Sequence, residues 1–154
     1  RVLAPDLVSV PLFDDRFLVV LPESHPAVGH DPVPLEMLAG DGWILSQQVD
    51  EPSDRMLVAA AAAVGFEPRA VLRTDDYDVM FGFVAAGVGV ALASDMALVP
   101  RDGLVIRRLG GPTLSRSVEF VTFRRGSPPA VAVLLQALRE EADQRHQPAS
   151  ASAS

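Results

Sequence analysis

The sequence predicts an α/β fold in which helices and strands alternate along the chain and the strands form a doubly wound sheet. Two segments, residues 53–73 and 75–94, share one plan: a capped helix, a glycine that ends it, and then a strand. A further observation is that the runs FLVVL at 17–21 and WILS at 43–46 are apolar without alternation. Such runs are typical of strands that helices cover on both faces.

Before residue 53 the sequence predicts two strands with a proline-rich loop between them. The first strand covers residues 17–21. Residues 22–34 carry four prolines and are expected to form a loop, which a short helix at 35–39 follows. The second strand covers residues 43–46. This arrangement would place two buried strands ahead of the first long helix.

The first long helix is expected to begin near Ser53 or Asp54, because both side chains are good N-caps, and to end at Gly65. Its run of alanines favours helix and allows another surface to pack closely against it. Residues 68–73, PRAVLR, are then expected to form a strand.

A second helix is expected to begin at a capping carboxylate, Asp75 or Asp76, and to end at Gly87. Its buried face is expected to comprise Val79, Met80, Phe83 and Val84. Residues 88–92 follow as a buried strand. Gly87 and Gly89 come after a helix and before a strand, the reverse of a phosphate-binding loop. We therefore expect capping and close backbone packing there, and no cofactor.

The last third of the chain predicts two strands and a helix. The strands are LVIRRL at 104–109 and SVEFVTF at 117–123. Prolines 128 and 129 suit the first turn of the helix, whose inner face is expected to comprise Val131, Leu134, Leu135 and Leu138. The closing residues 147–154, QPASASAS, are expected to be disordered.

Charge and composition exclude several classes of function. A formal net charge of -7 disfavours nucleic-acid binding by these residues, because phosphate contacts need clustered positive charge. The sequence has no cysteine, so it offers no disulfide, thiolate metal site or thiol nucleophile. The three histidines share no metal-ligand spacing and the motif GxSxG does not occur, so we expect neither a metal site nor an enzyme. No apolar run has membrane-spanning length, and a cytoplasmic location is expected.

Four segments in order resemble the effector-binding domain of LysR-type transcriptional regulators: PLFDDRFLVVLPESHPAV, LEMLAGDGWIL, AAAVGFEPRAVLRTDDYDVMFGFVAAGVGVALAS and LVIRRLGGPTLSRSVEFVTFRR. The resemblance implies a fold like the type 2 periplasmic binding proteins, with two α/β subdomains, two crossing strands and an effector cleft between the subdomains. Residues 23–94 would form the second subdomain, and residues 1–22 and 95–146 would be the returning portions of an incomplete first one. It also implies that the N-terminal winged helix-turn-helix, the linker helix and the opening part of the first subdomain are absent from this chain.

The resemblance further implies which residues bind the effector. Strand ends and helix N-termini line the cleft of such a domain, and their unpaired N–H groups attract carboxylates. The expected effector-binding residues are Ser46, Gln47, Gln48, Ser53, Thr74, Asp76 and Val118. The alternative is that these are ordinary turn, cap and core residues.

An ion pair between Arg16 and Asp76 is expected at the hinge of the resembling fold. An aspartate that faces an anionic effector needs a neutralising partner, because like charges repel strongly in a cleft of low dielectric. The alternative is a solvated arginine and a separate helix cap.

Taken together, these features predict a non-enzymatic, ligand-sensing module of a bacterial regulator that binds a small, anionic metabolite. It would reach DNA only through the absent winged helix-turn-helix and would form a homodimer or tetramer in the full-length protein. All 13 basic residues are arginine, which indicates a GC-rich bacterial genome. The alternative function is a solute-binding protein of a transport system, which would have the same architecture.

Overall fold

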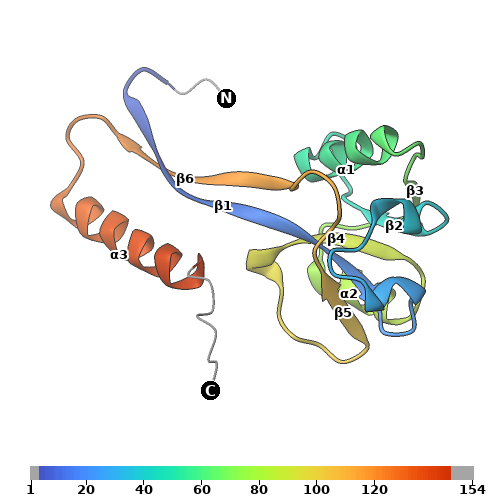
Figure 1. Cartoon of the computed structure of the whole chain (residues 1–154). Helices are drawn as coiled ribbons and strands as arrows, with labels where there is room; N and C mark the ends of the chain where they lie inside the picture. The colour runs from blue at the N-terminus through green and yellow to red at the C-terminus, as the bar shows by residue number, and fades with distance from the viewer. Residues whose placement is uncertain (1–3, 147–154) are drawn as a thin grey trace. The chain divides into compact units, whose positions relative to one another are not determined.

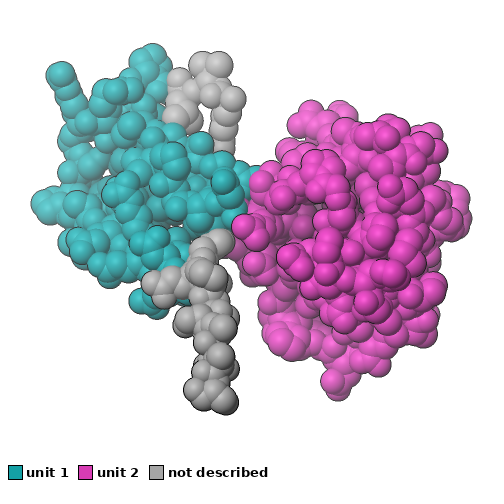
Figure 2. Space-filling model, in the orientation of Figure 1, with its two compact units in different colours: residues 1–14, 116–154 teal, residues 15–115 magenta. Residues whose placement is uncertain are grey.

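A computed structural model describes residues 4–146 of the chain (Figure 1). The chain divides into two compact units, which Figure 2 colours separately. Unit 2 is the continuous segment Asp15–Ser115, and unit 1 combines residues 1–14 with 116–154. The predicted subdomain boundaries at 22/23 and 94/95 stay a prediction. The predicted disordered tail, 147–154, lies outside the described residues.

Unit 2 contains a mixed sheet with the strand order β3-β2-β4-β1-β5. Strand β2 (Gly42–Leu45) lies between β3 (Arg69–Arg73) and β4 (Val90–Ser94) and is parallel to both. Strand β1 (Leu7–Pro22) is antiparallel to β4 on one side and to β5 (Leu104–Arg107) on the other. The predicted strand 17–21 is therefore correct in place but is only part of a longer strand.

Helices α1 (Pro52–Ala63) and α2 (Tyr77–Ala85) cover opposite faces of this sheet. Successive residues of a strand point to opposite faces, so Trp43 packs in the core with α1 while Ile44 packs in the core with α2. Burying a leucine or valine side chain completely stabilises the fold by about 1.5–3 kcal/mol. Two apolar layers thus sandwich the sheet, which is the doubly wound arrangement predicted.

Both long helices of unit 2 end as predicted, in a glycine with positive φ. Gly65 has φ 91° and Gly87 has φ 74°. The Gly87 N–H donates to the carbonyl of Val84 at 2.8 Å, and the Val88 N–H donates to that of Phe83 at 3.0 Å. This pair of bonds satisfies carbonyls that the last helical turn would otherwise leave unpaired.

The start of α1 differs from the prediction. Its N-cap is Glu51, Pro52 occupies the first helical position, and Ser53 and Asp54 lie within the first turn. The physical reason is that proline is preorganised for the first helical position, where its missing N–H costs nothing. The predicted caps are therefore wrong, and α1 begins without a side-chain cap.

The buried face of α2 is also shifted from the prediction. The helix buries Met80, Phe81 and Val84, while Val79 and Phe83 are each 41% exposed. Nearly every residue of YDVMFGFVA is apolar, so periodicity could not single out the face that meets the sheet.

Three short 3-10 helices complete unit 2: η1 (Pro26–Gly29), η2 (Leu35–Leu38) and η3 (Asp95–Ala97). The second of these is the short helix expected at 35–39. It buries Leu35 and Leu38 in the core beside α1.

Unit 1 combines the first part of β1 with β6 (Ser115–Phe123) and helix α3 (Pro129–His146). Strand β6 pairs with β1, and within unit 1 the Ser9 hydroxyl donates to Glu119 Oε2 at 2.6 Å. The predicted inner face of α3 is wrong at Leu134, which is 51% exposed. Ala142 is the buried residue of α3 among those with described side chains.

Candidate functional site

A pocket of about 370 Å³ opens in unit 2 where β2 and β3 end and where α1 and α2 begin. In open α/β sheets, ligands bind outside the carboxyl ends of the strands, at places of this kind. The lining residues are Ile44, Leu45, Ser46, Gln48, Glu51, Ser53, Asp54, Leu57, Thr74, Asp75, Asp76, Tyr77, Met80 and Leu92. The pocket thus combines an apolar floor with a polar rim.

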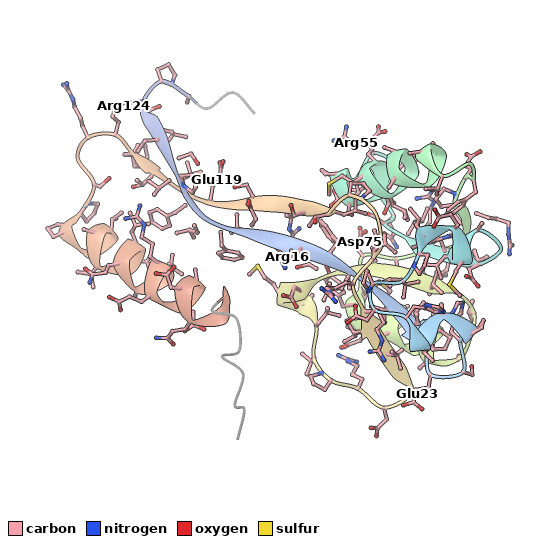
Figure 3. The ribbon with its side chains drawn as sticks, viewed as in Figure 1. Arg16, Glu23, Arg55, Asp75, Glu119 and Arg124 are labelled. Atoms are coloured by element: carbon pink, nitrogen blue, oxygen red, sulfur yellow. The ribbon has the colours of Figure 1, made fainter. Side chains whose placement is uncertain are left out.

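Asp75, which Figure 3 labels, is hydrogen-bonded to the loop after β2. Its Oδ1 accepts from the Ser46 hydroxyl at 2.6 Å and from the Gln47 N–H at 2.9 Å. The Ser46 hydroxyl in turn accepts from the Gln48 N–H at 3.2 Å. The hydrogen bond from the Ser46 hydroxyl has the largest effect on the pKa of Asp75, and the bond from the Gln47 N–H the next largest. Both lower this pKa from its ordinary value. Asp75 is therefore a carboxylate at neutral pH.

Asp54 reaches the same loop from the first turn of α1. Its Oδ2 accepts from the Ser46 N–H at 3.1 Å and lies 3.7 Å from Arg73 Nη1. The same arginine nitrogen donates to the Ser46 carbonyl at 2.8 Å. Burial raises the pKa of Asp54, and the Ser46 N–H and Arg73 offset part of that rise. Arg73 is thus already engaged by the Ser46 carbonyl and the Asp54 carboxylate.

Asp76 is the N-cap of α2. It was one of the two residues, Asp75 and Asp76, that the sequence predicted for this cap. Its Oδ1 accepts from the N–H groups of Asp78 at 2.8 Å and Val79 at 3.1 Å. The Asp76 N–H donates to Thr74 Oγ1 at 3.1 Å. Two N–H donors in the first turn of α2 are therefore occupied by the Asp76 carboxylate.

Sequence reasoning located much of this pocket. Ser46, Gln48, Ser53, Thr74 and Asp76 all line it. Gln47 does not line it but donates its N–H to Asp75, which does. Their roles as effector contacts stay predictions, because the structure shows only that they share one cavity.

Three acidic lining residues were missing from the predicted site: Glu51, Asp54 and Asp75. Their position in the sequence could have indicated them, since each lies within a few residues of a strand end or a helix start. Asp54 and Asp75 were each one of two residues expected to cap a helix. The N-cap of α1 is instead Glu51, and that of α2 is Asp76.

The predicted hinge ion pair is absent. Within residues 4–146, Arg16 and Asp76 form no ion pair, and Arg16 instead lines a separate cavity of about 440 Å³ with Asp95. Asp76 instead caps α2 through its Oδ1, which accepts from the N–H groups of Asp78 and Val79. Val118 lies half-buried on β6, in the other unit, and its role as a cleft wall stays a prediction.

The charge of the rim disagrees with the expected anionic ligand. The acidic lining residues are Glu51, Asp54, Asp75 and Asp76. Among the described residues that line the pocket, none is arginine, lysine or histidine. An anion placed here would meet carboxylates at short range, which disfavours its binding.

The model of the LysR substrate binding domain family matches residues 1–143. The chain belongs to this family. Its curated relatives include the DNA-binding transcriptional dual regulator OxyR of Escherichia coli K12, which is 30% identical over 124 residues, 79% of this chain and 40% of OxyR. The regulator CysB of Burkholderia cenocepacia is 31% identical over 124 residues, 79% of this chain and 39% of CysB. The chain thus spans about 40% of the length of these relatives.

Among solved structures, the BenM effector binding domain with its effector benzoate superimposes on this LysR domain with a TM-score of 0.77. The match covers 100% of this chain and 72% of the BenM chain at 17% identity, so it establishes the fold alone. LysR effector-binding domains have the periplasmic-binding-protein-like fold, and the predicted fold class and family are confirmed. Among the helices that the structure describes, none is both long and apolar enough to cross a bilayer.

Proposed function

We propose that this chain is the effector-binding part of a LysR-type transcriptional regulator and that its pocket in unit 2 binds a small molecule. The observation that carries the proposal is the pocket itself. Loops after two parallel strands and the starts of two helices converge on one cavity of about 370 Å³, in a chain whose family is named for substrate binding. BenM, which has the same fold, holds the small organic molecule benzoate as its effector.

The proposed signal is a shift in population between conformations of the domain. A ligand changes such an equilibrium only as far as its affinities for the two conformations differ. Both chain connections between the units run within strands, since unit boundaries fall inside β1 and β6. Ligand binding would bias the arrangement of the units, and these strands would carry the change.

The regulator itself would act in the cytoplasm, as a homodimer or tetramer and without catalysis. DNA binding would belong to a winged helix-turn-helix outside these 154 residues, since their net charge of -7 is unsuited to phosphate contacts. The relatives OxyR and CysB carry the names of transcriptional regulators, and this favours regulation over the alternative of solute transport. Since none of these residues is cysteine, the sensing step within them cannot be a thiol switch.

The proposal is tested by screening metabolites against the purified chain and measuring the rise in melting temperature, because a ligand that binds the folded state stabilises it. Ser53→Phe would fill the pocket from the first turn of α1 without changing its charge. We expect this variant to abolish the rise caused by any hit.

The matched control is Val58→Phe, which adds bulk at an exposed position of the same helix that does not line the pocket. It should respond like the parent chain. Hits that stabilise Ser53→Phe as much as Val58→Phe would show that the ligand binds elsewhere, and the proposed site would then be wrong.

A further inference from the structure

We propose that the ligand of this pocket is an organic cation, a primary amine or guanidine with a small apolar body. This inference rests on the proposed function, because it takes the pocket as the ligand site. The volume of the pocket, its place at the strand ends and the family match all support a ligand there. The chemistry of the rim then decides which class of ligand fits.

Four N–H donors at the start of α2 and after β2 are already engaged by internal carboxylates. The N–H groups of Asp78 and Val79, at the start of α2, both donate to Asp76 Oδ1. After β2, the Ser46 N–H donates to Asp54 and the Gln47 N–H to Asp75. An incoming carboxylate would have to displace an internal carboxylate at each of these positions, which offers no gain in hydrogen bonding.

Hydrogen-bond acceptors, in contrast, remain available around the pocket. The hydrogen bonds that Asp75 and Asp76 accept with their side chains all end on Oδ1. In the part of the chain that the structure describes, Oδ2 of either residue accepts no hydrogen bond. Glu51 receives one long bond, 3.4 Å from the Ser53 hydroxyl to Oε1. An ammonium or guanidinium group supplies the donors that these oxygen atoms lack.

The balance of charge points the same way. Four acidic residues line the pocket, and Arg73, which approaches Asp54, does not line it. Asp75 is ionised at neutral pH because its hydrogen bonds favour the carboxylate. The field in the pocket therefore attracts cations and repels anions.

The rest of the lining favours an organic cation over a metal ion. Ile44, Leu57, Met80 and Leu92 offer an apolar floor, and the ring of Tyr77 can lie against a cationic group. Among the described residues, no group of three or more histidine, aspartate or glutamate side chains is placed to hold a metal ion. A volume of about 370 Å³ lies within the range of small-molecule sites, which begins at roughly 300 Å³.

The test compares benzylammonium with benzoate, which have similar shapes and opposite charges, by NMR titration of the ¹⁵N-labelled chain. Benzylammonium should shift the amide signals of Gln48, Ser53 and Asp76, and benzoate should leave them unchanged. Raising the ionic strength to about 1 M should weaken the binding of benzylammonium, because salt screens the attraction.

Two variants that remove one charge each should weaken benzylammonium binding by roughly two- to fivefold. They are Glu51→Gln and Asp76→Asn, and asparagine preserves the helix cap because it is as good an N-cap as aspartate. Glu67→Gln, an exposed position that does not line the pocket, is the matched control and should leave the affinity unchanged.

Benzoate binding at these amides as tightly as benzylammonium would overturn the inference about charge while leaving the proposed function in place. Failure of benzylammonium to shift these amides would also overturn it. The proposed function is decided separately by the Ser53→Phe screen, which does not depend on the charge of the ligand.

Discussion

At the residue scale, the two aspartates that hold the loop after β2 have opposite shifts in pKa. Hydrogen bonds, first from the Ser46 hydroxyl and then from the Gln47 N–H, lower the pKa of Asp75 below the ordinary value of an aspartate. Burial raises the pKa of Asp54 above that ordinary value. Ionisation of Asp75 therefore favours the folded state, whereas ionisation of Asp54 disfavours it.

This difference predicts two opposite dependences of stability on pH. The contribution of Asp75 is present above its unfolded pKa and is lost as the pH falls through its lower folded pKa. The advantage of the parent chain over Asp75→Asn should therefore shrink as the pH falls below about 4, the region of an unperturbed aspartate. Relative to Asp54→Asn, the parent should instead lose stability as the pH rises from about 4 through the raised folded pKa.

Urea unfolding followed between about pH 3 and pH 7 measures both differences, since the midpoint reports stability when the slope is unchanged. Each variant serves as the control for the other. The same pH trend for both variants would contradict the assignment of opposite shifts.

His25 illustrates how local sequence predicts a turn but not its contacts. It directly precedes Pro26 and is the N-cap of η1. Its Nδ1 accepts from the Ala27 N–H at 3.1 Å, so this nitrogen carries no proton and Nε2 is the one that donates to Asp41. The partner Asp41 lies 16 residues away, and no local pattern pointed to it.

At the element scale, the two glycines after α2 serve the predicted roles: Gly87 ends the helix with positive φ, and Gly89 allows close backbone packing. A Cβ on Gly89 would lie 2.4 Å from the carbonyl oxygen of Gly42, because β4 and β2 approach closely there. A Cβ on Gly82, inside α2, would meet nothing within 4 Å. The two positions therefore offer a matched pair of glycine-to-alanine substitutions.

We expect the two substitutions to change stability in opposite directions. Gly89→Ala should destabilise the chain by about 1–3 kcal/mol, because the backbone of a neighbouring strand must move. Gly82→Ala should stabilise it by about 0.5–1 kcal/mol, because alanine favours helix and loses less entropy on folding. Chemical denaturation measures both. A loss of stability in Gly82→Ala as large as that in Gly89→Ala would contradict the proposed difference in packing.

The helices show which part of an element can be predicted. Both ends marked by a glycine were correct, because a residue with positive φ needs glycine whatever surrounds it. Phe83, which was expected on the buried face of α2, is exposed, and Phe81, which was not among the residues expected there, is buried. Which of two phenylalanines faces the sheet depends on how the helix sits on it, and this is a tertiary property.

At the scale of the whole molecule, apolar burial is concentrated in unit 2. The buried hydrophobic residues of the described chain lie between Phe17 and Leu114, apart from Ala142 on α3. Val133 and Leu134 of α3 are 71% and 51% exposed. The free energy of local unfolding is low for a segment with few buried apolar contacts.

Hydrogen exchange should therefore distinguish the two units. We expect the backbone amides of β2 and β4 to be the best protected, and those of α3 to exchange many times faster, when exchange is followed by mass spectrometry or NMR. Helix α1, which buries Leu57, Ala60 and Ala61 against the sheet, is the internal control for a helix with a core. Protection of α3 equal to that of α1 would contradict this prediction.

The sequence by itself determined the features that depend on neighbouring residues. These are the alternation of helix and strand, the glycine ends of the helices, the family, and most of the residues at the strand ends that line the pocket. Backbone conformation and local hydrogen bonding depend on a few neighbouring residues, so the pattern of the sequence is enough to predict them.

Only the tertiary structure decided the charge of the pocket and the partners of its side chains. Asp54 and Asp75 come from different elements and meet at Ser46, where they accept hydrogen bonds from Ser46 and Gln47. Arg16, expected to neutralise Asp76, lines another cavity. The physical reason is that electrostatics depends on distances through space, and residues far apart in sequence come within a few ångströms only when the sheet assembles.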